Sequence, residues 1–190
     1  LLYAVADATT QALVLADLAG NPQRELTTFD GRITFLYSPD GGRVAYVPTD
    51  GDLQASTLGP LYVVEPETLR TVEVTDRPVL AFFWSPDASK LAYRSVERVR
   101  RRSGMRWAVG EGRERTAHAA SLPTQTVLGD FLPFFDQYAQ SHRIWAPDSN
   151  AFVFTGTLAN GESGVWVQQL GADLPPVNAG TGVFATWSPE

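Results

Sequence analysis

The hydrophobic residues of this chain fall in short runs, separated by segments rich in Gly, Pro, Asp and Thr. Many runs are rich in β-branched and aromatic residues, a pattern that predicts β-strands. No segment has the periodicity of a long amphipathic helix. We therefore expect an all-β fold. Its predicted strands are Leu2–Val5, Ala12–Leu15, Glu25–Thr28, Ile33–Tyr37, Arg43–Val47, Leu61–Val64, Thr71–Val74, Val79–Trp84, Lys90–Arg94, Val165–Gln169 and a weaker run near Val177.

One block of sequence recurs along the chain. Each copy begins with an aromatic residue, followed by Ser or Ala, Pro, and Asp or Glu, and the copies span 37–46, 84–93, 145–154 and 187–190, where the sequence ends. From proline to proline the steps are 47, 61 and 42 residues. Antiparallel units of four strands that repeat at about 40 to 50 residues are typical of β-propellers.

The block has the chemistry of a tight turn between two strands. Proline presets φ at the second turn position, while the serine before it and the aspartate after it can hydrogen-bond to nearby backbone. Gly41, at the fourth position of the first copy, suits a type I turn. Each block should therefore join two antiparallel strands.

The strand order follows from placing each block between the first two strands, A and B, of a four-stranded blade ABCD. The chain then runs BCD, ABCD, ABCD, ABCD, A, which amounts to sixteen strands or four blades within a single domain over 1–190. The final A strand would complete the blade that the first three strands open. Three arrangements stay open: a ring closed by one chain, a part of a larger ring, and an eight-bladed homodimer. A sandwich of two stacked sheets is the competing fold.

These blocks resemble the WD-repeat-like Pro-Asp repeats of TolB-type propellers. The resemblance covers nearly the whole chain, with an insertion in the middle copy. It implies a propeller and leaves the function open, since similar repeats occur in periplasmic TolB, in propellers of prolyl-oligopeptidase-like and tricorn-like proteases, in oligogalacturonate lyases and in uncharacterised bacterial surface proteins. It also implies an extracytoplasmic location, periplasmic or on the cell surface.

Composition argues against several functional classes. The absence of cysteine excludes disulfides, Cys-bound zinc and thiol catalysis, and two histidines, His118 and His142, leave little material for a His-based metal site. We expect both histidines at the surface or at strand ends. A net charge of −6 argues against nucleic acid as a partner, and no apolar run is long enough for membrane insertion.

Catalytic motifs are also missing from the sequence. A serine hydrolase of the α/β type needs Gly-x-Ser-x-Gly, and Gly161–Gly164 is one residue too short, so we interpret it as a turn before Val165. The segment Asp50–Asp52 lacks the further ligand spacing of a calcium loop. We therefore expect no catalytic residue, no metal site and no cofactor in this chain.

Two insertions carry the candidate binding residues. The segment 94–115 holds eight arginines and three glutamates, and it is expected to form an extended BC hairpin whose arginines either protect an exposed edge or bind an anionic partner. The segment 131–138 is rich in large apolar residues, which should either cover a core or an open blade edge, or form a contact surface with another protein. The candidate binding residues are Arg98, Arg100, Arg101, Arg102, Arg106, Phe131, Phe134, Phe135 and Tyr138.

Propeller geometry would bring these insertions together. In antiparallel blades the AB and CD turns emerge on one face and the BC and DA turns on the other. The loops around 95–105, 129–141 and 48–60 should then share one face, opposite the Pro-Asp corners. The function predicted is a non-catalytic binding or scaffolding module that recognises a protein or peptide, including an anionic one. The alternatives are the accessory propeller of a larger prolyl-oligopeptidase-like hydrolase, and a propeller that binds or cleaves acidic oligosaccharides.

Overall fold

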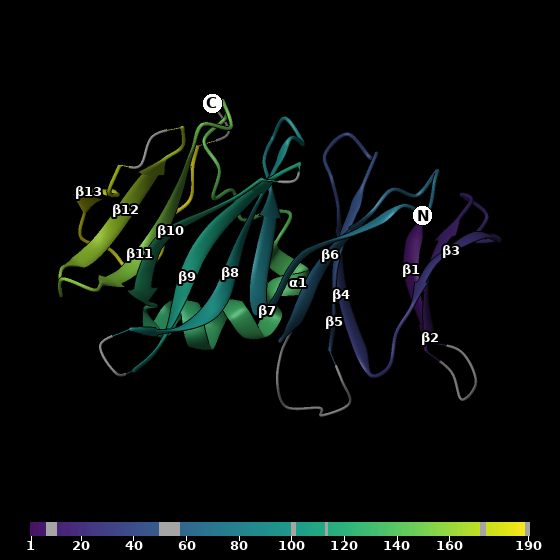
Figure 1. Cartoon of the computed structure of the whole chain (residues 1–190), viewed down its shortest axis with the longest axis horizontal. Helices are drawn as coiled ribbons and strands as arrows, with labels where there is room; N and C mark the ends of the chain where they lie inside the picture. The colour runs from purple at the N-terminus through teal and green to yellow at the C-terminus, as the bar shows by residue number, and fades with distance from the viewer. Residues whose placement is uncertain (7–10, 50–57, 100–101, 113, 172–173, 189–190) are drawn as a thin grey trace. The chain divides into compact units, whose positions relative to one another are not determined.

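The computed structural model describes residues 1–6, 11–49, 58–99, 102–112, 114–171 and 174–188, and Figure 1 shows that they form almost entirely β-structure. The strands belong to antiparallel sheets of three strands, ordered β1-β2-β3, and ten strands, ordered from β13 to β4. The chain divides into two compact units, Leu1–Pro78 and Val79–Glu190. None of the described helices is long and apolar enough to cross a membrane.

The first unit contains two sets of consecutive antiparallel strands. β1 (Leu2–Ala6), β2 (Gln11–Ala16) and β3 (Pro22–Thr28) form the smaller sheet. β4 (Arg32–Tyr37), β5 (Val44–Thr49) and β6 (Gly59–Val64) begin the larger one. Residues from both sheets share one core, which consists of Leu13, Leu26, Val44, Tyr46 and Val64. Every strand predicted up to Val64 is present within one to three residues of its expected bounds.

The strand β7 (Thr71–Trp84) departs from the prediction, because it joins two strands that the sequence suggested separately. The predicted runs Thr71–Val74 and Val79–Trp84 are its two ends. Pro78 lies between them and favours extended backbone at the residue before it, so the connection continues as strand instead of turning. β7 thus leaves the first unit and becomes the first strand of the second.

The second unit begins with a four-stranded meander. β7 pairs with β8 (Lys90–Val99), β8 with β9 (Arg102–Glu111), and β9 with β10 (Glu114–Leu122). A second group of strands follows, formed by β11 (Ala151–Leu158), β12 (Ser163–Gln169) and β13 (Val177–Gly180). Only two register pairs, Ser121 with Leu158 and Leu122 with Thr157, connect β10 to β11. The second group thus diverges from the meander.

The three complete Pro-Asp blocks form the same corner. In the second copy the Ser85 backbone N–H donates to Lys90 O at 2.9 Å, and the Lys90 N–H donates back to the Ser85 hydroxyl at 2.9 Å. Asp87 accepts from that hydroxyl at 2.6 Å. The first copy repeats these bonds. The third, with alanine in place of serine, keeps the bond from the Ala146 N–H to Ala151 O and a bond from the Asn150 N–H to the Asp148 carboxylate, and lacks those of the serine hydroxyl. The predicted turn chemistry is confirmed.

A left-handed residue completes each corner at the same position. The φ angles there are +72° at Gly41, +59° at Ala88 and +59° at Ser149. This conformation strains any residue with a Cβ, so among the three only Gly41 adopts it without strain. The shared angle is independent support for treating the three blocks as equivalent bends.

The connection between β10 and β11 is helical, which the strand pattern did not indicate. It contains a π-helical turn (Val127–Phe131), a 3₁₀ turn (Leu132–Phe134) and a single α-helical turn, α1 (Phe135–Tyr138). After it, the strand expected before the third corner is reduced to one bridge between Trp145 and Phe152. The helical segment lies at the end of the second unit where β8 ends and β9 begins, opposite the corner that joins β7 to β8 (Figure 1).

The segment that ends the described chain lies within the second unit. Ala185 O accepts a hydrogen bond from the His142 ring at 2.8 Å, and the Trp187 N–H donates to Arg143 O at 2.8 Å. Val183 O accepts from the Thr124 and Thr155 hydroxyls. These bonds tie the segment 183–187 to the helical connection and to β11.

Candidate functional site

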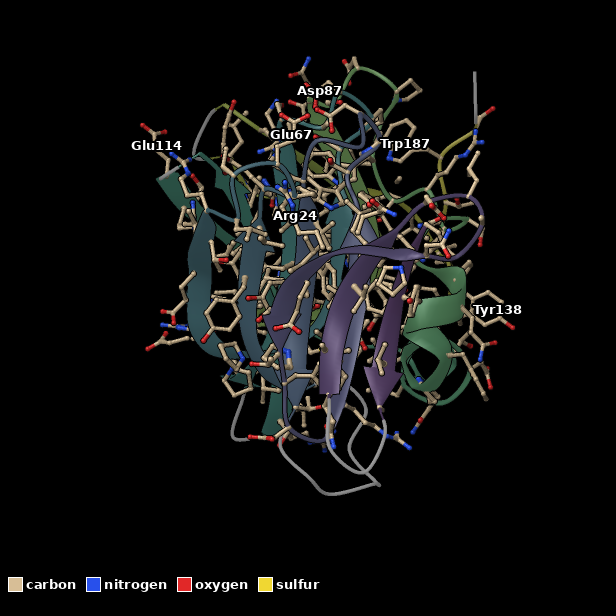
Figure 2. The ribbon with its side chains drawn as sticks, turned by 90° about the vertical axis from the view of Figure 1, so that its right-hand side faces the viewer. Arg24, Glu67, Asp87, Glu114, Tyr138 and Trp187 are labelled. Atoms are coloured by element: carbon tan, nitrogen blue, oxygen red, sulfur yellow. The ribbon has the colours of Figure 1, made fainter. Side chains whose placement is uncertain are left out.

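The Arg-rich hairpin is formed by β8 and β9, which pair in register from Lys90 with Glu111 to Val99 with Arg102. Arg102 is exposed at its end. The backbone of Arg98 pairs with Ser103, while its side chain and the whole of Arg100 and Arg101 lie outside the described residues. Figure 2 shows the side chains of both units from the side. Of the five predicted arginines, Arg102 is the one that the structure places on the surface with a described side chain.

Arg106 occupies a different environment from Arg102. Its guanidinium forms an ion pair with Glu97, with one hydrogen bond of 2.8 Å to Glu97 Oε1, and it donates to His118 O at 2.8 Å. The hydrogen bond to Glu97 raises the pKa of Arg106. Because this arginine is already neutralised across the hairpin, it stabilises the strands and offers little charge to a partner.

The four predicted aromatic residues divide into two pairs. Phe131 and Phe135 are buried, with 7% and 2% of their surface exposed, whereas Phe134 and Tyr138 are 47% and 45% exposed. Phe135 lies 5.2 Å from Phe82 and 5.4 Å from Phe83 between ring centroids. The buried pair therefore covers the face of β7, and only Phe134 and Tyr138 are available as a contact surface.

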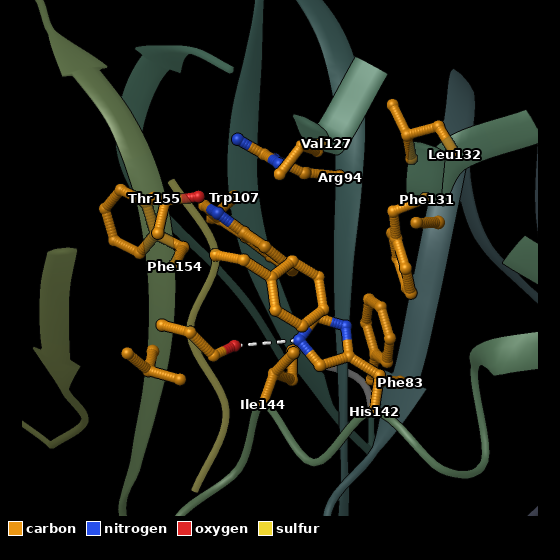
Figure 3. Close-up of a pocket in the computed structure, with 14 residues that line it drawn as sticks. Phe83, Arg94, Trp107, Val127, Phe131, Leu132, His142, Ile144, Phe154 and Thr155 are labelled. Carbon is orange, nitrogen blue, oxygen red and sulfur yellow. Dashed lines mark hydrogen bonds between the residues drawn. The ribbon is translucent and has the colours of Figure 1, made fainter. Parts of the chain in front are cut away.

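Behind the surface pair, aromatic rings continue into the unit. Tyr138 stacks on Phe131 with centroids 6.3 Å apart, and Phe131 lies 4.6 Å from the His142 ring. His142 in turn stacks on Phe184 at 4.4 Å, with 19° between the planes. Phe131, His142 and Phe184 form one wall of a cavity in the second unit (Figure 3), and Tyr138 lies outside it.

The cavity has an apolar lining with a charged group in it. Its volume is about 30 Å³. Aromatic and aliphatic side chains supply most of the wall, and Arg94, Trp107, His142 and Thr155 supply its polar groups, as Figure 3 shows. Among the described residues that line it, none carries a carboxylate.

Arg94 is the unexpected member of this site, since the sequence suggested an arginine of an exposed hairpin. It is 3% exposed. Its Nη2 donates to the Ser121 hydroxyl at 3.2 Å, its Cζ lies 4.9 Å from the Trp107 ring centroid, and its Nε has no hydrogen-bond partner. Burial lowers the pKa of Arg94 to about 10, so the guanidinium keeps its charge at neutral pH.

The repeat could have revealed this burial. The residue directly after each complete ten-residue block is Val47, Arg94 or Thr155, and the other two are also buried. A charged residue at a position that is apolar or small in the other copies is a sequence signal for a buried functional group.

The histidines were expected at the surface or at strand ends, and both are half-buried. His142 is half-buried, and its Nε2 faces Ala185 O at 2.8 Å. Because a carbonyl only accepts, Nε2 carries the proton, and the buried Nδ1, which has no partner, is an acceptor in the neutral ring. Burial lowers the pKa of His142 and outweighs the bond to Ala185 O, which raises it. His118 is half-buried on β10, with its ring 5.7 Å from that of Phe152.

Metal-binding clusters are not found in the described part of the chain, where no group of three or more His, Cys, Asp or Glu residues could hold an ion. The segment Asp50–Asp52 lies outside the described residues. Two candidate binding features remain: the cavity with Arg94, and the surface formed by Phe134 and Tyr138.

Solved structures place this architecture in the class of β-propeller proteins. The chain is similar to TolB from Acinetobacter baumannii, with 18% identity over 91% of this chain and a TM-score of 0.52. It is also similar to an oligogalacturonate lyase in complex with manganese, with 15% identity over 85% of the chain and a TM-score of 0.51. Both are β-propellers, which supports a TolB-like fold.

The chain corresponds to only part of each of these structures. The chain spans 39% of the TolB structure and 40% of the lyase. A structure of a prolyl endopeptidase covers 92% of the chain at 13% identity, with a TM-score of 0.49. No protein-family model and no curated protein matches the sequence. The likeness is therefore one of fold.

Proposed function

We propose that the chain is a non-catalytic propeller module of four blades that recognises an anionic protein or peptide. The binding surface is the end of the second unit that carries the helical connection and the β8–β9 turn. The supporting observation is the exposure of Phe134 and Tyr138 above a buried pair, Phe131 and Phe135, that anchors their segment. Aromatic side chains held by a rigid support are typical of contact surfaces, since they bury much area at little entropic cost.

Charge supports an anionic partner. The segment 94–115 carries a local excess of arginine in a chain whose net charge is −6. Arg94 and Arg106 are engaged inside the unit, so the charge available to a partner comes from Arg102 and from the predicted contributions of Arg98, Arg100 and Arg101. Such rim charges act mainly on the association rate and on its salt dependence.

The test is binding to an array of acidic, basic and neutral peptides at low and at physiological salt. The double variant Phe134→Ser with Tyr138→Ser should lose binding to the acidic peptides, and Arg102→Glu should weaken it and reduce its salt dependence. Leu18→Ser is the matched control, because Leu18 is fully exposed in the first unit. Equal binding by the double variant and the control would contradict the proposal.

A second candidate follows from the extent of the chain relative to its structural neighbours. The chain spans 39% and 40% of them, and an accessory propeller of a larger hydrolase is the alternative that the Pro-Asp repeats suggested. The complete gene decides between them. A Gly-x-Ser-x-Gly motif followed by Asp and His outside 1–190 would favour the hydrolase.

A further inference from the structure

The cavity of the second unit contains a charge without a counter-charge. Buried arginines are normally paired with carboxylates, because an unpaired ion in a protein interior is costly. Arg94 is 3% exposed, and its contacts are a hydroxyl and an aromatic ring. Both contacts are weaker than an ion pair, so a bound anion would stabilise the buried guanidinium further.

Two buried donors in the cavity wall, Arg94 Nε and Trp107 Nε1, lack a hydrogen-bond partner. A third unpartnered nitrogen there, His142 Nδ1, is an acceptor in the neutral ring, so an anion would not satisfy it. About nine in ten buried polar groups in proteins have a hydrogen-bond partner, so three exceptions around one cavity are unusual. The guanidinium and indole nitrogens carry hydrogen and have no acceptor capacity, so Arg94 Nε and Trp107 Nε1 can only donate. An occupant that satisfies them must accept hydrogen bonds.

The size of the cavity restricts the occupant. A water molecule needs about 10 to 15 Å³, so 30 Å³ admits two waters or a group of similar size. Water would leave the charge of Arg94 without a counter-charge. A carboxylate has the right size, accepts from two donors at once, and supplies the missing negative charge.

We infer that this cavity is a binding site for a small carboxylate of one or two carbons, held by Arg94 and Trp107. This inference is independent of the proposed peptide surface, which involves exposed side chains. Phe131, His142 and Phe184 form the aromatic wall beside this site. The class of ligand is a small carboxylate such as formate or acetate.

The indole N–H signals of the tryptophans provide a direct test. Sodium formate is titrated into the ¹⁵N-labelled chain at constant ionic strength, held by a bulky sulfonate buffer. The Trp107 signal, assigned with Trp107→Phe, should shift with saturation and show a nuclear Overhauser effect to the formate proton. Trp145 and Trp166 are internal controls, since their Nε1 groups already donate to Phe83 O and Gly156 O. No saturable shift at Trp107, or equal shifts at all three, would overturn the inference.

Variants separate the site from general anion effects. Arg94→Met removes the charge at similar length and should weaken formate binding at least about tenfold, the order expected for a charged hydrogen bond. Arg143→Met is the matched control, because Arg143 is exposed and adjacent in sequence to His142. Unchanged affinity in Arg94→Met would also overturn the inference. The titration of the unaltered chain decides the question if Arg94→Met does not fold.

Discussion

The guanidinium of Arg94 lies over the indole of Trp107, with Cζ 4.9 Å from the ring centroid, inside a wall of aromatic rings. The two residues are register partners on the neighbouring strands β8 and β9, where Arg94 is opposite Trp107. The pairing of β8 with β9 thus places a buried cation over an aromatic ring. The favourable free energy of folding of the unit must offset the cost of desolvating that cation.

This arrangement predicts opposite effects of one substitution under two conditions. Without a bound anion, Arg94→Met should leave the free energy of unfolding unchanged or raise it by about 1 to 2 kcal/mol, because a well-packed apolar side chain replaces an uncompensated charge. In excess formate, the unaltered chain should gain stability that the variant does not. Urea unfolding in both buffers measures the two differences, and a variant that is equally stabilised by formate would contradict the prediction.

The corner formed by Ser85 and Asp87 predicts a dependence on acid. Burial alone would raise the pKa of Asp87, but hydrogen bonds from Ser85 and Ser89, with the charge of Lys90, bring it well below its usual value. Its contribution to stability is therefore complete above the unfolded pKa of about 3.9 and is lost as pH falls toward the folded value. Asp87→Asn should reduce stability at neutral pH and flatten this loss.

The third corner supplies the control for that experiment. Asp148 accepts the Asn150 N–H at 3.0 Å, but alanine replaces the serine at position 146. Asp148→Asn should consequently have a smaller effect than Asp87→Asn. Thermal unfolding of both variants between about pH 2.5 and 7 measures the difference, and identical profiles would exclude the role given to the Ser85 hydroxyl.

His142 predicts a second pH effect in a different range. Burial lowers its pKa, so the folded state binds fewer protons than the unfolded state below the unfolded pKa of about 6.5. Stability should be full above that pH and decline as pH falls below it. His142→Gln should remove part of this decline. Guanidinium unfolding from about pH 8 to 5 without formate provides the measurement, and an unaltered slope in the variant would contradict the assignment.

The aromatic connection predicts a division between stability and binding. Phe135 is 2% exposed, so Phe135→Ala should cost about 3 to 5 kcal/mol, the range for large aromatic deletions from cores. Phe134 is 47% exposed, and Phe134→Ser should cost less than about 1 kcal/mol. Denaturant midpoints at a constant m-value test the difference, which would vanish if the whole segment were a surface loop.

Strands and corners were predictable because they depend on local chemistry. Alternating apolar residues and the Pro-Asp turns specify them wherever the chain lies, and bonds such as Ser85 N–H to Lys90 O repeat in each complete copy. The fusion of the two predicted strands into β7 was not predictable from the runs. The residues between them include Pro78, which is equally typical of a turn. The helical turns of 127–138 were hidden by their aromatic composition, which is equally typical of strands.

The candidate site was predicted less well, and Arg94 explains why. Its burial depends on side chains contributed by β9, β11 and the helical connection, and these meet only in the folded unit. Arg106 was likewise counted as available, although it forms an ion pair with Glu97 on the neighbouring strand. Charge counting along a sequence cannot distinguish an arginine that is solvated from one that is paired or buried.

We expect the Pro-Asp corners to be equivalent bends in successive blades arranged around one axis. A crystal structure of the chain tests this claim most directly. We predict that the corners at Ser38, Ser85 and Ala146 occupy equivalent places in sheets related by rotation about that axis. Two stacked sheets without a common axis would contradict this claim, together with the binding surface derived from it.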